Sequence, residues 1–463
     1  MTHVHLIGIG GTGLSAIARV LLESGYTVSG SDRSLSPLAQ SLQAAGVRVY
    51  LGHQPENISG ADVVVRSSAI SDDNPEVQAA RAAGIPVYKR ADFLGRLMQN
   101  RTGIAVAGTH GKTTTTAMIT WMLVALQQDP SYIVGGVLKN LGSNAHAGKG
   151  SAFVIEADEY DRMFLGLQPQ MIVVTNMEHD HPDCYPTPAD YALAFRQFCD
   201  RLQPGGAVFT CADDPGTQAL YRDIAGTRRV YTYGFAADAD FQARNLTLSA
   251  QGSAHFDAVL RQSDGSLTHL ASVDLQVPGE HNVRNALAAL AVAHQLDLPL
   301  AQAAAALAGY SGTGRRFEVR GEAAGVTVID DYAHHPTEIR ATLAAARARY
   351  HHRRIWAVWQ PHTYSRTQTL LDAFTASFDD ADRVIVTDIY AAREPKQAFS
   401  GADIVRRMAH PAAQFISTLD AVSSHLIQQL QPGDVLIVLS AGDADQISAN
   451  VLEALHESEA HHA

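Results

Sequence analysis

The sequence predicts an α/β protein of three domains: an N-terminal Rossmann-like domain, a central P-loop mononucleotide-binding domain and a C-terminal Rossmann-like domain. Its 463 residues exceed what one hydrophobic core usually supports. Short apolar runs alternate with amphipathic stretches along the chain, a pattern typical of parallel sheets covered by helices. Two glycine-rich loops, at residues 8–13 and 108–113, each stand between a predicted strand and a predicted helix.

The composition is that of an ordinary globular protein and excludes several classes of function. Apolar residues make up 46% of the chain and charged residues 18%, which argues against disorder and fibrous repeats. The formal charge of −12 repels a phosphate backbone, so we expect no nucleic-acid partner. No apolar run reaches the roughly 18 residues that span a bilayer. Three cysteines without CxxC spacing fit a reducing compartment. We therefore expect a soluble, cytoplasmic protein, and the sequence leaves open whether it is a monomer or a homodimer.

The first predicted domain covers residues 1–100 and begins with a nucleotide-binding pattern. Residues 8–13 satisfy G-x-G-x-x-G after an apolar run, and Asp32 ends the next predicted strand. Such glycines let a diphosphate approach the N–H groups of a helix N-terminus. The pattern alone fits a dinucleotide, another nucleotide diphosphate or a tight turn without a ligand. A nicotinamide-dependent dehydrogenase is therefore one kind of enzyme that this loop indicates.

The second predicted domain, residues 101–312, carries the second glycine loop. A strand at 104–107 leads into Gly108-Thr109-His110-Gly111-Lys112-Thr113, and a helix follows to about residue 126. The loop is shorter than a full Walker A, because Val106 occupies the place of its first glycine. It still offers helix N–H groups, an ammonium and a hydroxyl for a magnesium-bound phosphate. We expect Lys112 to be an exposed loop lysine. A regulatory P-loop ATPase is a further interpretation of this loop.

Two acidic clusters follow the next apolar runs of this domain. Glu156 directly follows one run, and residues 176–183 follow the next and include His181. Carboxylates at strand ends near a P-loop suit Mg²⁺, which prefers oxygen ligands, so Glu156 is a candidate metal ligand. His181 is a candidate ligand of a second ion.

The rest of the second domain is predicted to change from strands to helices. Residues 228–277 alternate in a β-like pattern, and an alanine-rich helical stretch covers 286–307. Asn282 and Asn285 lie one turn apart at the start of that helix. Their amides could read an adenine edge, but residue chemistry alone favours a helix cap formed by His281 or Asn282. A glycine-rich segment at 309–314 suggests the boundary to the third domain.

The third predicted domain, residues 313–463, again alternates apolar strands with helices. Two polar clusters, at 330–338 and 360–366, each follow an apolar run and therefore lie at a sheet edge. These two clusters bring together several polar side chains, which indicates a site for a polar substrate. The side chains are those of Asp331, Tyr332, His334 and Arg366.

Together these segments resemble the muramyl ligases, the ATP-dependent enzymes of peptidoglycan precursor synthesis. The resemblance covers nearly the whole chain. Nine ordered motifs carry it: 8–13 with 29–32, 67–70 with 74–76, 108–116, 156–161, 176–183, 279–285, 312–317, 330–338 and 360–367.

The resemblance implies a ligase reaction with three substrates. In the kind of member it resembles most, the lactyl carboxylate of UDP-N-acetylmuramate attacks the γ-phosphate of ATP. The resulting acyl phosphate is then attacked by the amine of L-alanine, which leaves an amide. The implied cofactors are ATP and Mg²⁺, with two metal ions. The implied domains bind the UDP-sugar, ATP and the amino acid in that order.

The resemblance also implies roles for particular residues. The implied catalytic residues are Lys112, His181, His334 and Arg366. The implied ATP-binding residues are Gly108, Thr109, His110, Gly111, Lys112, Thr113, Thr114, Asn282, Asn285, Arg316 and Asp331. The implied UDP-sugar residues are Gly10, Gly11, Thr12, Gly13, Ser31, Asp32, Ser67 and Ser68. Tyr332, His334 and Arg366 are implied for the amino acid, and Thr113, Glu156 and His181 for the metals.

Two positions depart from the pattern of some members of this family. Tyr160 stands where some members have serine, and Thr363 where some have arginine. The first departure raises a runner-up, the murein-recycling ligase that attaches a whole tripeptide to UDP-N-acetylmuramate. Tyr332 and residues 360–366 resemble that enzyme less well.

Overall fold

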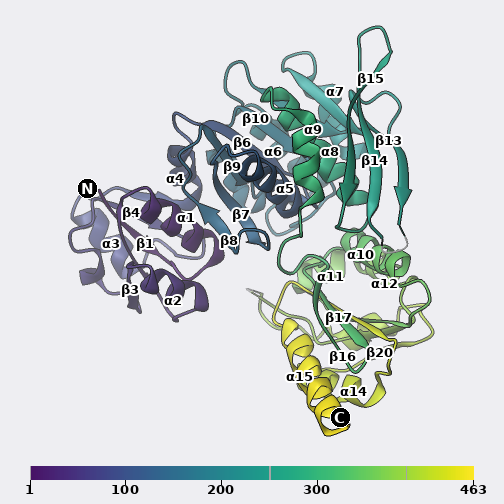
Figure 1. The fold of residues 1–463 in the computed structure, drawn as a ribbon. Helices are drawn as coiled ribbons and strands as arrows, with labels where there is room; N and C mark the ends of the chain where they lie inside the picture. Colours follow the sequence, from purple (N-terminus) through teal and green to yellow (C-terminus); the bar gives the residue numbers. More distant parts are fainter. Residues whose placement is uncertain (1, 250–251, 393, 463) are drawn as a thin grey trace.

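The computed structural model describes residues 2–249, 252–392 and 394–462 and contains three sheets, which confirms the predicted three-domain α/β class. The sheets occupy residues 3–89, 102–275 and 318–440. Figure 1 shows the N-terminal sheet to the left of the central sheet and the C-terminal sheet below it. The domain limits at residues 100 and 312 remain predictions.

The N-terminal domain is a parallel sheet in the order β3-β2-β1-β4-β5. The strand order reverses between β1 and β4, and ligands bind beyond the carboxyl ends of strands at such a point. Its strands are β1 (His3–Ile7), β2 (Thr27–Asp32), β3 (Arg48–Leu51), β4 (Val63–Arg66) and β5 (Val87–Lys89). Its helices are α1 (Thr12–Glu23), α2 (Pro37–Ala44), α3 (Pro75–Ala82) and α4 (Arg90–Leu97).

The central domain is a ten-stranded sheet in the order β15-β14-β13-β12-β11-β10-β6-β9-β7-β8. Its parallel middle gives way to antiparallel pairs at both ends. The parallel strands are β6 (Thr102–Ala107), β7 (Ser131–Leu138), β9 (Ala152–Glu156), β10 (Met171–Val174), β11 (Ala207–Cys211) and β12 (Val230–Gly234). The others are β13 (Phe241–Leu248), which is parallel to β12 and antiparallel to β14, and the antiparallel strands β8 (Ser143–His146), β14 (Ala254–Arg261) and β15 (Leu267–Leu275).

Helices cover both faces of this sheet because its middle strands are apolar on both sides. Ile104 and Val106 of β6 pack with α5 (Lys112–Ala125), α8 (Glu280–Gln295) and α9 (Leu300–Ala308). Ala105 and Ala107 point to the other face, towards α6 (Pro188–Cys199) and α7 (Pro215–Ile224). That second core also includes residues of α1 and α4, so the N-terminal domain packs on the central domain through apolar side chains. The strands thereby hold the P-loop on a rigid support.

The C-terminal domain is a six-stranded sheet in the order β16-β17-β21-β18-β19-β20, parallel except for β16. Its strands are β16 (Glu318–Ala323), β17 (Val326–Asp331), β18 (Ile355–Gln360), β19 (Arg383–Val386), β20 (Ala413–Phe415) and β21 (Val435–Ser440). Its helices are α10 (Pro336–Arg349), α11 (Tyr364–Thr369), α12 (Leu371–Thr375), α13 (Gly401–Val405), α14 (Leu419–Gln429) and α15 (Asp445–His462). Alternate residues of β18 pack into two separate hydrophobic cores, as those of β6 do in the central sheet.

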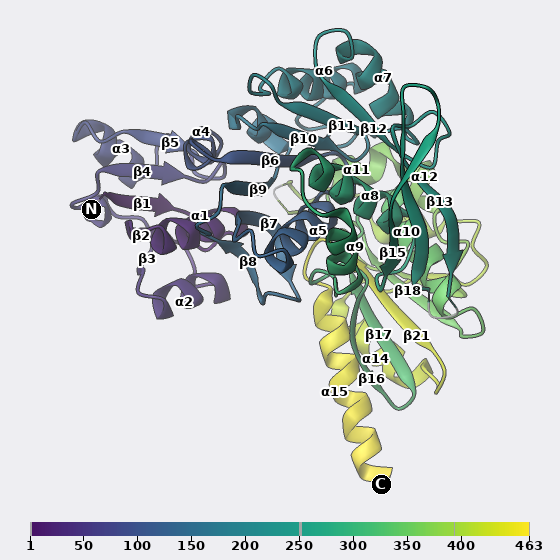
Figure 2. The same cartoon turned by 45° about the horizontal axis from the view of Figure 1, so that its top comes forward.

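The helix α10 lies on the side of the C-terminal domain that faces the central domain (Figure 1). Figure 2 shows α15 extending away from the other elements at the end of the chain. Within the described residues, no helix combines the length and the apolar character needed to cross a membrane.

Asp330, at the end of β17, gives a stability prediction outside the site. Its side chain is 2% exposed and accepts from Ser448, and burial raises its pKa from 3.8 to about 6. A carboxyl group with a raised folded pKa favours the folded state below pH 3.8, and this advantage is lost as the pH rises through 6. The difference is worth about 3 kcal/mol.

We therefore expect Asp330→Asn to stabilise the protein by about 2–3 kcal/mol at pH 7.5 and by clearly less at pH 5. The lost ion pair with Arg320 is part-exposed and contributes little. Urea unfolding at both pH values measures the gain, with the exposed Asp223→Asn as the matched control. A destabilised Asp330→Asn variant, or an equal gain at both pH values, contradicts this prediction.

Candidate active site

The central glycine loop joins β6 to α5 in a conformation that needs its glycines. Gly108 has a φ of 138° and Gly111 a φ of 78°, and a Cβ on Gly108 would lie 2.0 Å from Thr175 Oγ1. No described side chain caps the N-terminus of α5, so its first N–H groups are available to an anion. Val106, which replaces the first Walker glycine, is buried in β6. The shortened loop therefore presents N–H groups of the kind that suit a phosphate.

Lys112 is not the exposed loop lysine that we expected, since its side chain is only 15% exposed. Its Nζ donates to Gly108 O at 2.6 Å and to Glu159 Oε1 at 2.9 Å. Burial alone would lower the pKa of Lys112, but the Glu159 and Asp158 carboxylates outweigh it and raise this pKa. The loop therefore keeps this ammonium charged and holds it against the carbonyl of Gly108.

Glu159 is fully buried beside this ammonium. Burial raises its pKa to about 7 although Lys112 opposes the shift. Its Oε2 has no hydrogen-bond partner among the described residues, and its Oε1 lies 3.7 Å from His181 Nε2. A buried oxygen without a partner points to a group that this site binds.

Thr113 and Glu156 lie together beside the loop, as a shared metal site requires. The Thr113 hydroxyl donates to Glu156 Oε1 at 2.9 Å, and Gly135 N donates to Glu156 Oε2 at 2.7 Å. A hydroxyl and a carboxylate at the start of a P-loop helix form a hard donor set that suits Mg²⁺. The residues thus fit the implied ion.

His181 and Arg366 meet across the boundary between the central and C-terminal domains. Arg366 Nε donates to Asp180 Oδ1 at 2.9 Å, and both side chains are at most 6% exposed. Arg366 Nη2 lies 3.4 Å from His181 Nδ1. Burial and the neighbouring cations Arg366 and Lys112 lower the pKa of His181, which keeps its imidazole neutral. A neutral imidazole is the form that binds a metal.

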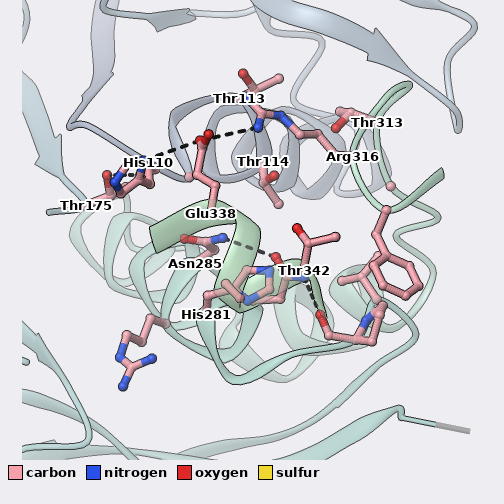
Figure 3. A pocket seen from close by; sticks show the side chains of 18 of the residues that line it. His110, Thr113, Thr114, Thr175, His281, Asn285, Thr313, Arg316, Glu338 and Thr342 are labelled. Atoms are coloured by element: carbon pink, nitrogen blue, oxygen red, sulfur yellow. Dashed lines mark hydrogen bonds and ion pairs between the residues drawn. The ribbon is translucent and has the colours of Figure 1, made fainter. Parts of the chain in front are cut away.

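A cavity of about 590 Å³ opens beside the P-loop, between α8 and α10. Figure 3 shows side chains of its wall, which come from the P-loop, α8 and the C-terminal domain. Seven of the implied ATP-binding residues beyond the loop glycines line it: His110, Thr113, Thr114, Asn282, Asn285, Arg316 and Asp331.

The helix cap predicted for His281 or Asn282 is wrong. The N-cap of α8 is Gly279, whose φ of 97° suits glycine and sets the start of the helix through the backbone alone. Asn282 Nδ2 donates to Pro278 O at 2.7 Å, and Asn285 Nδ2 donates to Asn282 Oδ1 at 3.2 Å. The two amides therefore form a linked pair, and both residues line the cavity. A contact of these amides with an adenine edge stays a prediction.

The C-terminal residues Tyr332 and His334 lie next to one another after β17. His334 Nδ1 lies 2.8 Å from Tyr332 O, and burial lowers the pKa of His334 to about 3. The guanidinium of Arg316 lies 5.2 Å from the centre of the Tyr332 ring. Asp331 Oδ2 accepts from Phe317 N at 2.8 Å. The centres of the His334 and His362 rings are 6.1 Å apart, and His362 Nδ1 lies 3.3 Å from Arg366 Nη1, so His362 connects this region with Arg366.

The predicted UDP-sugar residues gather at the carboxyl edge of the N-terminal sheet. Gly10 N donates to Asp32 Oδ2 at 2.9 Å, and a Cβ on Gly8 would lie 3.1 Å from Ser67 Cβ. Gly11 is the N-cap of α1, which begins with Thr12, and Gly13 lies against the guanidinium of Arg90. Ser68 is exposed next to Ser67.

Ser31 differs from the other predicted UDP-sugar residues because its side chain is buried. Its hydroxyl donates to Glu76 Oε2 at 2.5 Å, and Glu76 also accepts from Asn57 Nδ2 at 2.6 Å. A side-chain contact of Ser31 with a ligand is therefore not supported. Its role here is to hold Glu76 beneath the sheet edge.

Comparison with known proteins assigns the family. The "Mur ligase family, catalytic domain" model matches residues 3–102, the "Mur ligase middle domain" model 106–293, and the "Mur ligase, glutamate ligase domain" model 315–442. The chain belongs to the Mur ligase family. The dehydrogenase interpretation of the first glycine loop is therefore dropped.

Curated relatives match this Mur ligase over nearly its full length. It is 43% identical over 98% of its chain to UDP-N-acetylmuramate--L-alanine ligase of Salinibacter ruber, covering 94% of that protein. It is 45% identical over 98% of its chain to the protein of the same name from Acidobacterium capsulatum, covering 97% of that protein.

Two solved structures are similar in fold over the whole chain. UDP-N-acetylmuramate-alanine ligase from Thermotoga maritima has a TM-score of 0.81 and 28% identity, with 99% of this chain and 100% of that chain covered. A murein peptide ligase from Psychrobacter arcticus has a TM-score of 0.72 and 27% identity, with 98% and 99% covered.

Tyr160 and Thr363, the two residues that depart from the pattern of some family members, each have a defined place in the structure. The Tyr160 hydroxyl donates to Asp183 Oδ2 at 3.0 Å, and the Tyr160 ring packs on the His181 ring. Thr363 has a φ of 64° and is the N-cap of α11. Tyr160 therefore helps to fix His181, and Thr363 shapes the turn that presents Arg366.

Sequence reasoning missed several residues of this site. Glu76, Glu159, Asp180 and Glu338 lie inside the nine family motifs, but only burial and pairing in the structure indicate their importance. Arg90 lies outside these motifs, and nothing in the sequence singles it out as a polar partner. The contacts of Glu76 and Arg90 join segments about 20 to 70 residues apart in the chain.

Proposed function

We propose that this Mur ligase joins the lactyl carboxylate of UDP-N-acetylmuramate to L-alanine at the expense of ATP, in peptidoglycan precursor synthesis. The observation that carries the proposal is the full-length match to relatives that share one name, at 43–45% identity. The P-loop, the paired Asn282 and Asn285 amides and the Thr113–Glu156 pair support it, because each has the chemistry that one part of ATP requires.

In the proposed first step, a lactyl oxygen attacks the γ-phosphorus and ADP leaves. Lys112, the N–H groups at the start of α5 and Arg316 neutralise the charge that spreads over the transferring phosphoryl group. Thr113 and Glu156 would hold one Mg²⁺ and His181 a second, and these ions would add positive charge at the phosphates. The product is an acyl phosphate.

In the proposed second step, the amine of L-alanine attacks the acyl carbon and phosphate leaves. Tyr332, His334 and Arg366 lie at the domain boundary, where they would orient the amino acid. The neutral state of His334 at physiological pH suits a hydrogen-bonding role rather than a charged one. The step yields an amide and inorganic phosphate.

The proposal assigns residues 1–100 to the UDP-sugar, 101–312 to ATP and 313–463 to the amino acid. It places the enzyme in the cytoplasm with small-molecule substrates, in keeping with three free cysteines. The glycine loop would hold the diphosphate part of the sugar nucleotide, and Asp32 would accept a hydrogen bond from its ribose.

The test is a panel of acceptors assayed with UDP-N-acetylmuramate and ATP. We expect ADP release with L-alanine to exceed that with glycine by roughly 10- to 200-fold, since one methyl group is worth about 1–3 kcal/mol. A preference for L-Ala-D-Glu-diaminopimelate would favour the tripeptide ligase instead. ATP turnover independent of the muramyl nucleotide would indicate a regulatory P-loop ATPase.

A further inference from the structure

His110, in the P-loop, contacts two carboxylates that belong to different domains. Its Nε2 lies 3.0 Å from Glu178 Oε2, after β10 of the central domain. Its Nδ1 lies 3.3 Å from Glu338 Oε1, in the first turn of α10 in the C-terminal domain. We call this arrangement of His110, Glu178 and Glu338 the His110 bridge, and Figure 3 shows its contact with Glu338.

Both contacts can be hydrogen bonds only if the imidazole carries two protons. A neutral imidazole has one N–H donor and one acceptor nitrogen, whereas an ionised carboxylate only accepts. Glu178 also accepts from the Thr337 hydroxyl at 2.7 Å, and Glu338 from His334 N at 3.0 Å. Each carboxylate thus accepts hydrogen bonds from more than one donor, which is the environment of an ionised carboxylate.

The charges around the ring agree with this geometry. Burial alone would lower the pKa of His110, but hydrogen bonds to Glu178 and Glu338 outweigh it and raise this pKa to about 9. Burial would raise the pKa of Glu178, but His110, His335 and Thr337 lower it to about 2. The pKa of Glu338 likewise lies well below its usual value, through His334, His110 and Arg316.

A second histidine packs on the ring without adding a second charge. The centres of the His110 and His335 rings are 4.6 Å apart, and His335 Nδ1 accepts from Thr337 N. Burial and the charge of His110 lower the pKa of His335 to about 4. At neutral pH the ring pair therefore holds one positive charge, between two negative ones.

The bridge also shapes the cavity. Five residues of α10 line the cavity: Thr337, Glu338, Ala341, Thr342 and Arg349. Glu338 lies 3.5 Å from Arg316 Nη1, so the same carboxylate holds the proposed phosphate ligand. The position of α10 against the P-loop therefore decides whether the nucleotide site has its C-terminal wall.

We propose that His110 is a positioning residue whose doubly protonated imidazole holds α10 and Arg316 in place through Glu338 and so completes the nucleotide site. This inference rests on the proposed ATP site. It differs from a direct contact between His110 and phosphate, because it requires Glu338.

A double-mutant cycle tests the bridge in the full-length protein. His110→Ala, Glu338→Ala and the double variant are titrated with ADP by calorimetry at pH 7.5. We expect each single change to weaken ADP binding about 10- to 100-fold, the range of a charge-assisted hydrogen bond, and the double change to weaken it no further. Binding of UDP-N-acetylmuramate should stay unchanged. Glu338→Gln, which keeps the shape and loses the charge, serves if an alanine variant fails to fold.

The pH dependence separates a protonated bridge from mere packing. The folded pKa of about 9 lies above the ordinary 6.5, so the contribution of the bridge is complete below pH 6.5 and is lost as the pH rises through 9. The coupling between positions 110 and 338 should therefore disappear at pH 10. His255→Asn, which alters an exposed histidine paired with Asp274, should leave ADP binding unchanged at both pH values.

The outcomes are distinct. If the unaltered protein binds no ADP, the proposed ATP site fails and this inference fails with it. If it binds ADP and the two single effects add in the double variant, only the bridge is overturned. Equal coupling at pH 7.5 and pH 10 overturns the requirement for a protonated imidazole.

Discussion

Lys112→Ala is expected to reduce acyl phosphate formation by roughly 1000-fold or more, since the proposed mechanism places this ammonium at the transferring phosphoryl group. The lysine is held for this task by Gly108 O and Glu159 Oε1. The fold should survive, because Glu159, whose pKa is already about 7, can take up a proton when its partner is removed. Phosphate release with saturating substrates measures the effect.

Lys149→Ala is the matched control for this change, since Lys149 is an exposed loop lysine of the same domain. Its phosphate release should equal that of the unaltered protein. Circular dichroism and thermal unfolding show whether each variant is folded. A folded Lys112→Ala variant with normal turnover would refute the assignment of the phosphate site.

Arg366→Ala is the second large effect that we expect. It leaves the Asp180 carboxylate buried without its ion-pair partner, which costs about 3–5 kcal/mol as long as the domains stay docked. Because the partners lie on different domains, the protein can avoid this cost if the C-terminal domain undocks and water reaches Asp180. We therefore expect a larger radius of gyration in small-angle scattering and amide formation reduced at least roughly 100-fold.

Arg406→Ala removes an arginine of an exposed ion pair in the same domain and should change neither quantity. Asp180→Asn combined with Arg366→Met removes both charges and should restore the compact scattering profile without restoring amide formation. An unchanged profile together with unchanged amide formation in Arg366→Ala would contradict this role of the ion pair.

Much of the fold follows from local patterns in the sequence. The strand at 104–107 and the helix after it could be placed because an apolar run meets a glycine loop, and β6 and α5 occupy these positions. Local patterns do not predict which strands pair with one another. That β13, β14 and β15 extend the central sheet, with β13 parallel to β12, depends on contacts that no local pattern specifies.

Site residues could be predicted from the sequence where they stand in a recognisable motif. Their hydrogen-bond and ion-pair partners could not be predicted where these partners come from another domain. Asn282 illustrates the limit, because its chemistry favours a cap while the positive φ of Gly279 makes a cap unnecessary. Ser31 illustrates another, since its place beside Asp32 gives no sign of the buried Glu76. The His110 bridge and the Asp180–Arg366 pair each join two sheets that are separate in sequence.

The most direct measurement of the central claim follows an oxygen atom. UDP-N-acetylmuramate labelled with ¹⁸O in its lactyl carboxylate is incubated with ATP, Mg²⁺, L-alanine and the protein, and the released phosphate is analysed by mass spectrometry. If the carboxylate attacks the γ-phosphorus and the amine then displaces phosphate from the acyl carbon, each phosphate carries one oxygen of the carboxylate. Phosphate with no ¹⁸O, alongside amide formation, would contradict an acyl phosphate and with it the proposed reaction.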